Sequence, residues 1–322
     1  MSAPSVSFSG RVLVLAGGVG GARMARGLAR ALPDPARLTI AVNTADDFVH
    51  LGLAISPDLD TVLYTLAGIE NPDQGWGRAD ETWSFMETLE KFGGETWFRL
   101  GDKDLALHVF RTRALAEGRT LAAVTAELCR RFDIRAEILP MTNDKVATVV
   151  ETDAGTLAFQ DYFVRRRCAP KVAGFRFLGA DDAKPLPRLI ERLADPALGA
   201  IVVAPSNPFV SIAPILALAG VRAAIDACPA PIIAVSPLVG GEAVKGPAAK
   251  MIAELGEIPS VRWIAERYAG LIDGIVIDEA DREEAEKIRG PRVRVAKTVM
   301  RSDADRATLA ALVLAFAEEL RS

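Results

Sequence analysis

The 322-residue sequence has few of the side chains that most often build metal centres and cross-links. It contains two histidines, His50 and His108, and three isolated cysteines, Cys129, Cys168 and Cys228, with no Cys-x-x-Cys pair. So sparse a set excludes a zinc cluster, a disulfide framework and a mechanism that needs several histidines. Any chemistry must therefore rest on carboxylates, lysine, arginine, backbone amides or a metal bound through oxygen.

A basic excess and long apolar segments are also missing. Lysine and arginine number 38 against 42 aspartates and glutamates, a net charge of −4, whereas nucleic-acid-binding proteins usually carry an excess of basic residues. The sequence has no run of about 20 apolar residues, and residues 1–10 lack the regions typical of a signal peptide. We therefore expect a cytoplasmic protein with neither a nucleic-acid nor a membrane partner.

What the sequence does contain is an alternation of short apolar runs and helical segments. Six runs have the composition of buried strands, at residues 12–16, 38–42, 200–204, 231–235, 274–277 and 292–296. Helical patterns lie between and after them, at residues 22–32, 184–193, 212–227, 248–255 and about 303–320. Strand, helix and parallel strand in succession predict an α/β fold with a doubly wound, mainly parallel Rossmann-like sheet.

The middle of the chain is mainly helical. Three amphipathic helical patterns and a hairpin are found there, at residues 81–92, 104–116 and 120–132 and at residues 147–152 with 156–160. Asp102 and Thr120 are candidate N-caps of the second and third helices. We predict a Rossmann-like nucleotide-binding core made of residues 1–67 and 137–322, and a helical insert, residues 68–136, that contributes to an acceptor site.

A glycine-rich turn follows the first predicted strand and opens a helix; its glycines are Gly17, Gly18, Gly20 and Gly21. Glycines let the backbone approach an anion, and a helix N-terminus supplies free N–H groups, so the turn predicts a phosphate site. Tight packing of strand on helix is the alternative. The turn is not a Walker A loop, because no Gly-Lys-Ser/Thr follows, and it is not a clean G-x-G-x-x-G fingerprint, because Arg23 stands at the third glycine position. Asn43, at the end of the second strand, replaces the ribose-binding carboxylate of nicotinamide enzymes, which disfavours NAD.

Four aspartates follow the second predicted strand: Asp46 and Asp47 directly, and Asp58 and Asp60 in a Ser-Pro-Asp-Leu-Asp-Thr segment. Ligands of open α/β sheets bind at the carboxyl ends of the strands, so these carboxylates are expected beside the glycine turn. Carboxylates repel a phosphate unless a hard cation intervenes, and Mg²⁺ binds to carboxylate and phosphate oxygens together. In the alternative interpretation, Asp58 or Asp60 caps a helix that begins at Thr61.

Further polar segments follow later strands or begin a helix of the insert. Arg99 lies in Trp-Phe-Arg-Leu-Gly-Asp, which suits a ring-bearing ligand or, alternatively, is a helix start with an arginine extending to solvent. Asn207 and Ser211 offer hydrogen-bonding groups, and Lys245 and Lys250 can neutralise phosphate charge. The run of three arginines at residues 165–167 is more typical of a solvated face or a subunit contact, and no role is assigned to it.

Taken together, the motifs resemble a known family. They are Gly17 to Arg23, Asn43 to Asp47, Ser56 to Thr61, Arg99 to Asp102, Ile138 to Met141, Phe159 to Asp161, Ser206 to Pro208 and Val235 to Pro237. In this order, and over essentially the whole chain, they are similar to the CofD/FbiA-type 2-phospho-L-lactate transferases of deazaflavin coenzyme F-420 biosynthesis.

The resemblance implies a Mg²⁺-dependent transferase. The terminal ribityl hydroxyl of 7,8-didemethyl-8-hydroxy-5-deazariboflavin (Fo) would attack the phosphorus that bears a small hydroxy acid in a guanosine diphosphate ester, and GMP would leave. Asp60 and Arg99 match positions that hold Fo, and Asp47 and Asp60 are the candidates for the metal and for catalysis. The nucleotide would lie against the glycine turn, Asn207 and Ser211, and the loop from Lys245 to Lys250. We expect Asp47→Asn to lose turnover while it keeps its fold.

Two other functions are weighed against this one. A nucleotide-sugar-binding regulator of the related gluconeogenesis-factor group would share the glycine turn without catalysing transfer; Fo binding would separate the two. A nicotinamide-dependent oxidoreductase is the second, and the broken fingerprint disfavours it. The acid that is transferred stays open among 2-phospholactate, phosphoenolpyruvate and 3-phosphoglycerate. Some branches of the family have a Gly-Gly-Ala-Arg turn, as here, and others a Thr-Gly-Thr-Pro-Lys-like turn. These branches are associated with different acids, but the turn does not indicate which acid this chain accepts. A homodimer is expected from the resemblance alone.

Overall fold

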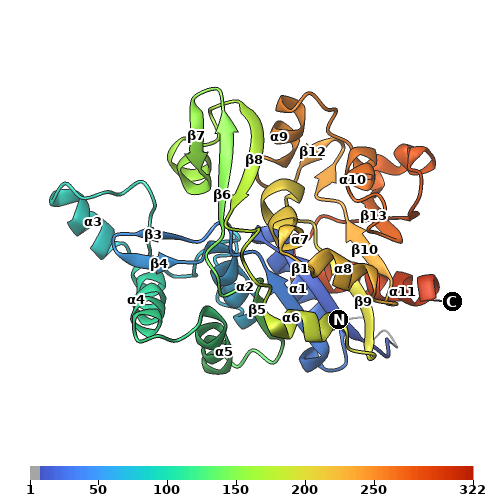
Figure 1. Cartoon of the computed structure of the whole chain (residues 1–322), viewed down its shortest axis with the longest axis horizontal. Helices are drawn as coiled ribbons and strands as arrows, with labels where there is room; N and C mark the ends of the chain where they lie inside the picture. Colours follow the sequence, from blue (N-terminus) through green and yellow to red (C-terminus); the bar gives the residue numbers. More distant parts are fainter. Residues whose placement is uncertain (1–7, 322) are drawn as a thin grey trace.

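The structure, a computed structural model, describes residues 8–321. Its centre is a seven-stranded sheet in the order β14-β13-β10-β9-β1-β2-β5, and every neighbouring pair of strands is parallel (Figure 1). The strands are β1 (Arg11–Ala16), β2 (Leu38–Val42), β5 (Glu137–Pro140), β9 (Leu198–Val203), β10 (Ile232–Val235), β13 (Gly274–Asp278) and β14 (Arg292–Ala296). The predicted α/β class and all six predicted strands are confirmed; β5 was not predicted as a strand.

Both faces of the sheet are covered, which is why its strands are almost continuously apolar. Side chains alternate along β1, so Val12 and Val14 pack on one face and Leu13 and Leu15 on the other. The first face is covered by α1 (Gly18–Ala31), α2 (Pro57–Ala67) and α11 (Asp303–Arg321). The second is covered by α6 (Pro187–Leu193), α7 (Ala213–Ala217), α8 (Val221–Asp226), α9 (Ala248–Glu254) and α10 (Val261–Arg267).

The strand order reverses at β1. From β1 the chain proceeds to β2 and β5 on one side, and later returns to β9 on the other side, from which it continues outward to β14. The loops after β1 and β9 therefore diverge and leave a crevice at the carboxyl edge, where ligands of doubly wound sheets bind. Ser206, after β9, bridges these loops: its hydroxyl donates to the Gly17 carbonyl at 2.8 Å and accepts from the Gly17 amide at 3.2 Å.

An insert lies between β2 and β5. It includes a hairpin of β3 (Phe48–His50) and β4 (Leu53–Ile55), and the helices α3 (Ser84–Lys91), α4 (Asp102–Ala116) and α5 (Leu121–Arg131). Figure 1 shows the hairpin, α3 and α4 projecting from one end of the molecule, around a small core of Ile55, Met86 and Leu100. The predicted domain limits fall between α2 and α3 and between α5 and β5.

A three-stranded antiparallel sheet, β7-β6-β8, stands beside the main sheet (Figure 1). The predicted hairpin is confirmed as β6 (Ala147–Thr152) and β7 (Gly155–Ala158), and β8 (Val172–Leu178), which was not predicted, adds a third strand. The remaining elements are η1 (Pro35–Arg37), η2 (Asp161–Arg165), η3 (Pro208–Ile212), η4 (Glu279–Lys287), β11 (Leu238–Val239) and β12 (Glu242–Ala243). Within residues 8–321, no helix has the length and apolar character to cross a bilayer.

Two local predictions were wrong. A single helix over residues 212–227 was expected, but Leu218 is extended and Gly220 has φ +83°, so the segment divides into α7 and α8. Asp102 is not the N-cap of α4, which follows Gly101; its carboxylate instead accepts from the backbone amides of Ser84 and Phe85 and so caps α3 from 18 residues away. Thr120 is confirmed as the N-cap of α5, because its hydroxyl accepts from the Ala123 amide.

Candidate functional site

A cavity of about 570 Å³ lies at the carboxyl edge of the sheet, between the core loops, the insert and the segment after β7. Its lining residues are Gly17–Gly20, Asp46, Ile55, Pro57, Asp58, Asp60, Thr61, Tyr64, Gln74, Trp76, Gly77, Phe98, Arg99, Asp104, His108, Phe159, Gln160, Phe163, Val164, Pro205–Asn207, Val210, Ser211 and Lys245–Pro247. The two loops of the crevice, the carboxylates and the aromatic residues of the insert therefore face one space.

The glycine turn forms the floor of this cavity. Gly17 is the N-cap of α1, and Gly18 begins the helix with φ +61°, a conformation that favours glycine. A Cβ at Gly20 would lie 2.1 Å from the Pro205 carbonyl oxygen, so only glycine allows the two loops to approach this closely. The amides of Val19 and Gly20 lie in the first turn, where no intrahelical acceptor exists, and both residues line the cavity. They are suited to bind an anion.

Asp46 and Asp58 form a linked pair at the edge of this turn. Asp58 accepts from the Gly18 amide at 2.8 Å, and the Asn43 side-chain amide donates to both Asp46 (3.1 Å) and Asp58 (3.0 Å). The helix that was expected to start at Thr61 begins at Pro57, and Asp58 binds the N-terminus of α1 rather than capping its own helix. Asn43, the residue that argued against NAD, holds the two carboxylates together.

Burial changes the pKa values of the aspartates beside the glycine turn, which form a rim of carboxylates. It raises the pKa of Asp46 and of Asp47 well above the ordinary value, and repulsion by Asp58 adds to the effect at Asp46. Burial likewise raises the pKa of Asp58 to about 6. Within residues 8–321, Asp46 Oδ1 and Asp47 Oδ1 are buried and have no hydrogen-bond partner. Clustered, under-partnered carboxylate oxygens are the donor set that a hard divalent cation prefers, so these residues fit Mg²⁺.

A prediction about pH follows from Asp58. Between pH 4 and pH 6 the folded protein holds this proton more tightly than the unfolded chain, so the contribution of Asp58 to stability falls as the pH rises through that window. Urea unfolding with a chelator present should show a shallower decrease with pH in Asp58→Asn than in the wild type. Identical pH slopes would contradict the assignment.

Asp60 belongs to a network of side chains in which its negative charge is balanced. Both of its oxygens pair with Arg111, whose side chain is 1% exposed, and His108 Nδ1 lies 3.7 Å from Asp60 Oδ2. His108 Nε2 lies 3.2 Å from Asp104, which accepts from the Tyr64 hydroxyl at 2.5 Å. Asp60, Asp104 and His108 each offer a ligand atom within 4.8 Å of the others, but the Arg111 guanidinium already supplies the positive charge.

The other sequence candidates are not all brought to the cavity. Asp47 accepts from the Ser56 hydroxyl at 2.7 Å and is outside the lining set of the described chain. Asn207 accepts from the Phe209 amide and lines the cavity together with Ser211 and Lys245. Lys250, in contrast, pairs with Glu254 and lies outside the cavity.

Arg99 lies on an aromatic wall. Its guanidinium carbon is 4.2 Å from the centroid of the Trp83 ring, and Arg99 lines the cavity beside Phe98. Across the cavity, Phe159 and Phe163 stack with ring centroids 5.3 Å apart, while Trp76 is 48% exposed. The wall is suited to a planar ring with polar edges.

The unassigned arginine run lies close to this wall. Arg165 lies over the Trp97 ring, 4.6 Å from its centroid, and pairs with Glu95, and Arg166 pairs with Asp161. At least these two side chains are therefore engaged within the chain.

Comparison with known proteins decides the family. The family described as "2-phospho-L-lactate transferase CofD" matches residues 12–315. The chain belongs to the CofD family. It is 43% identical over 320 residues to a phosphoenolpyruvate transferase from Streptomyces griseus, covering 97% of this chain and 100% of that protein. It is 40% identical over 314 residues to a 2-phospho-L-lactate transferase from Methanopyrus kandleri, covering 96% and 98% of the two chains.

Membership makes this chain a CofD-type transferase, as the resemblance implied. Among solved structures it is similar to a UPF0052 family protein from Bacillus halodurans, with a TM-score of 0.60 over 94% of this chain and 99% of that one. Identity to that protein is 18%, so the likeness shows the fold alone.

Several residues of this CofD-type site were not identified as candidates from the sequence. Arg111 and His108 come from α4 of the insert, and no local pattern brings them to Asp60 on α2. Tyr64 lies one turn after Asp60 on α2, but its hydrogen bond to Asp104 of α4 is not evident from the sequence. Asp46 lay within a recognised acidic segment, but only its deeper burial and its place in the cavity lining distinguish it from Asp47.

Proposed function

We propose that this CofD-type transferase moves a phospho-hydroxyacid group from its guanosine diphosphate ester to the ribityl hydroxyl of Fo, with release of GMP. One observation carries the proposal: a single cavity joins a glycine turn at a helix N-terminus, a rim of carboxylates and an aromatic wall with Arg99. Phosphoryl transfer depends mainly on positioning and on charge neutralisation, so a site with one histidine suffices.

In the proposed reaction a bond forms between the ribityl oxygen and the phosphorus that bears the acid. The bond from that phosphorus to the bridging oxygen breaks, and its electron pair leaves with GMP. Asp47 or Asp60 is the candidate to accept the hydroxyl proton. Because Arg111 holds both oxygens of Asp60, we favour an orienting role for Asp60, as a hydrogen-bond acceptor for the attacking hydroxyl.

Mg²⁺ is the proposed cofactor; carboxylates of this rim would hold it, and it would supply positive charge that neutralises the transferred group. Asp46 is the first candidate ligand, because it lines the cavity with a free oxygen; Asp58 shares its Asn43 bridge. Asp47 offers a buried free oxygen, while Asp60 could bind a metal only if Arg111 moved away. Asn43 and the Gly18 amide would hold Asp46 and Asp58 in position.

The decisive experiment is incubation with Fo, Mg²⁺ and each of three guanosine diphosphate esters, those of 2-phospholactate, phosphoenolpyruvate and 3-phosphoglycerate. We expect stoichiometric GMP release and a deazaflavin product of the corresponding mass from one donor or more. Binding of nucleotide without GMP release from any donor would reject the proposal in favour of a regulatory binding protein.

Arg99→Ala is expected to weaken Fo binding by roughly 10-fold, because the variant lacks the guanidinium that lies over Trp83 at the cavity wall. Titration of Fo fluorescence measures this directly. Arg165→Ala is the matched control, since Arg165 also lies over a tryptophan ring but outside the cavity lining. Equal losses in the two variants would argue against a direct contact of Arg99 with Fo.

A further inference from the structure

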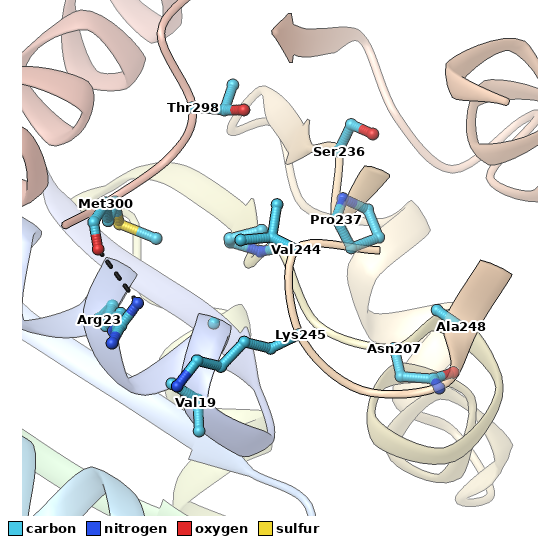
Figure 2. A pocket seen from close by; sticks show the side chains of 12 residues that line it. Val19, Arg23, Asn207, Ser236, Pro237, Val244, Lys245, Ala248, Thr298 and Met300 are labelled. Carbon is cyan, nitrogen blue, oxygen red and sulfur yellow. Dashed lines mark hydrogen bonds between the residues drawn. The ribbon is translucent and has the colours of Figure 1, made fainter. Parts of the chain in front are cut away.

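A smaller recess adjoins the main cavity at the glycine turn, and Figure 2 shows side chains that line it. It is lined by Val19, Gly20, Arg23, Pro205, Asn207, Ser236, Pro237, Val244, Lys245, Ala248, Thr298 and Met300. Val19, Gly20, Pro205, Asn207 and Lys245 line both spaces, so the recess continues the cavity beneath the loops after β9 and β10.

Two cationic side chains meet at this junction. Arg23 donates to the Met300 carbonyl at 3.1 Å, while its Nε is buried and has no hydrogen-bond partner in the described chain. Lys245 donates to the Gln74 carbonyl at 2.6 Å. Neither residue has a carboxylate within ion-pair distance among residues 8–321. Figure 2 shows Arg23, Lys245 and Val19 on one side of the recess, and Ser236 and Thr298 across it.

The two cations lie close together without an anion between them. A Cβ on Gly75 would be 3.1 Å from Arg23 Nη2 and 3.3 Å from Lys245 Nζ, so both nitrogens adjoin one glycine. Loss of hydration lowers the pKa of Arg23 and of Lys245, and the charge of Arg23 lowers that of Lys245 further. An anion bound here would relieve this repulsion, and its hydrogen bonds to the two side chains would compensate for the lost hydration.

Charges of opposite sign are thus separated by the glycine turn. Asp58, which Asn43 links to Asp46, adjoins Gly17 and Gly18, whereas Arg23 and Lys245 line the recess with Val19 and Gly20. If a donor with two phosphates lies across the turn, one phosphate would be near the carboxylates and any cation they hold. The other phosphate would be near the basic side chains. The arrangement therefore gives the donor a direction.

We propose that Arg23 and Lys245 form an anion subsite for the phosphate that leaves with the nucleoside. This inference rests on the proposed function and adds to it the orientation of the donor, with the nucleoside end in the recess and the acid end toward Asp46 and Arg99. As the bond to the bridging oxygen breaks, negative charge accumulates on the leaving phosphate, where the two cations stabilise it.

The test compares Arg23→Gln and Lys245→Gln with Arg30→Gln and Lys250→Gln. Arg30 lies on the same helix as Arg23 but pairs with Asp303, and Lys250 lies on the same segment as Lys245 but pairs with Glu254. Calorimetric titration with inorganic pyrophosphate and with GDP should show affinities reduced roughly 10- to 100-fold in the first pair and unchanged in the second. Wild-type affinity in Arg23→Gln and Lys245→Gln would overturn the subsite.

Product inhibition tests the orientation. Inhibition by GMP should weaken in Arg23→Gln, whereas inhibition by the free phosphoacid should not; the opposite result would reverse the proposed direction of the donor.

Fo fluorescence titration of the same variants separates this inference from the proposed function. If all variants bind Fo and transfer the group but pyrophosphate binding is unaffected, the subsite is wrong and the function stands. If pyrophosphate binding depends on Arg23 but no donor releases GMP, the subsite stands and the function is wrong.

Gly75→Ala provides an independent test of the same junction. Gly75 has φ +76°, and a methyl group there would also lie 2.8 Å from Val19 Cγ1. We expect pyrophosphate affinity to fall by roughly 5-fold or more because the two cations are displaced, with the melting temperature lowered by backbone strain. Gly77→Ala is the control, since Gly77 has φ +69° but open space at its Cβ; equal losses of affinity would indicate strain alone.

Discussion

Asp46→Asn is expected to reduce transfer at least about 1,000-fold while raising the free energy of unfolding of the metal-free protein above pH 7. The asparagine keeps an acceptor for the Asn43 amide but carries no charge, so the proposed metal loses a ligand. At the same time, the repulsion between Asp46 and Asp58 and the cost of burying a charge at position 46 disappear. Loss of activity and gain of stability in one variant is the signature of a strained binding site.

Three measurements check this result: GMP release at saturating Mg²⁺, calorimetric titration with Mg²⁺ alone or together with GDP, and urea unfolding with a chelator. Asp181→Asn is the control, because Asp181 is an exposed aspartate remote from the site. Asp47→Asn is also expected to lose turnover, and a comparison of Mg²⁺ affinities in the two variants assigns the ligand. Full activity in Asp46→Asn would exclude Asp46 from the metal site.

Arg111→Met is expected to destabilise the protein by about 3–5 kcal/mol, the largest effect on stability that we expect at the site. The substitution leaves the buried Asp60 carboxylate without its partner, close to the carboxylate of Asp104. Fo binding should weaken as well, because Asp60 lines the cavity and the pair fixes its orientation. Urea unfolding and Fo fluorescence titration measure the two effects separately.

The double variant Asp60→Leu/Arg111→Met distinguishes the pair from simple loss of packing. With both charges removed, most of the lost stability should return, since replacing a buried ion pair by apolar groups costs little. Fo binding should stay weak, because the cavity has lost its carboxylate. If the double variant is as unstable as Arg111→Met alone, packing rather than charge compensation holds this part of the insert to the core.

Local sequence was sufficient where one segment determines its own structure. Val12 to Ala16 forms a strand buried on both faces, and the glycines after it bring the start of α1 to the crevice. Thr120 caps its own helix. In each case the interacting atoms are a few residues apart, so the pattern alone contains the information.

Where the partners are distant in sequence, prediction was incomplete or wrong. Asp102 caps α3 instead of α4, because the start of α3 lies beside it only in the folded insert. Lys245 and Lys250 look equivalent in sequence, yet the turn into α9 places one at the cavity and the other against Glu254. The split of residues 212–227 depends on the positive φ of Gly220, which helical periodicity does not reveal.

Fold class, the position of the ligand edge and the CofD resemblance were all predictable from the amino-acid sequence, since all three depend on short motifs in a fixed order. Which charges face one another became evident only in the folded chain. Asp46 with Asp58, Asp60 with Arg111, and Arg23 with Lys245 are brought together by loops and helices that lie 12, 51 and 222 positions apart in the chain. Electrostatic energies fall with distance in space and rise as water is excluded, and neither quantity can be obtained from the order of residues.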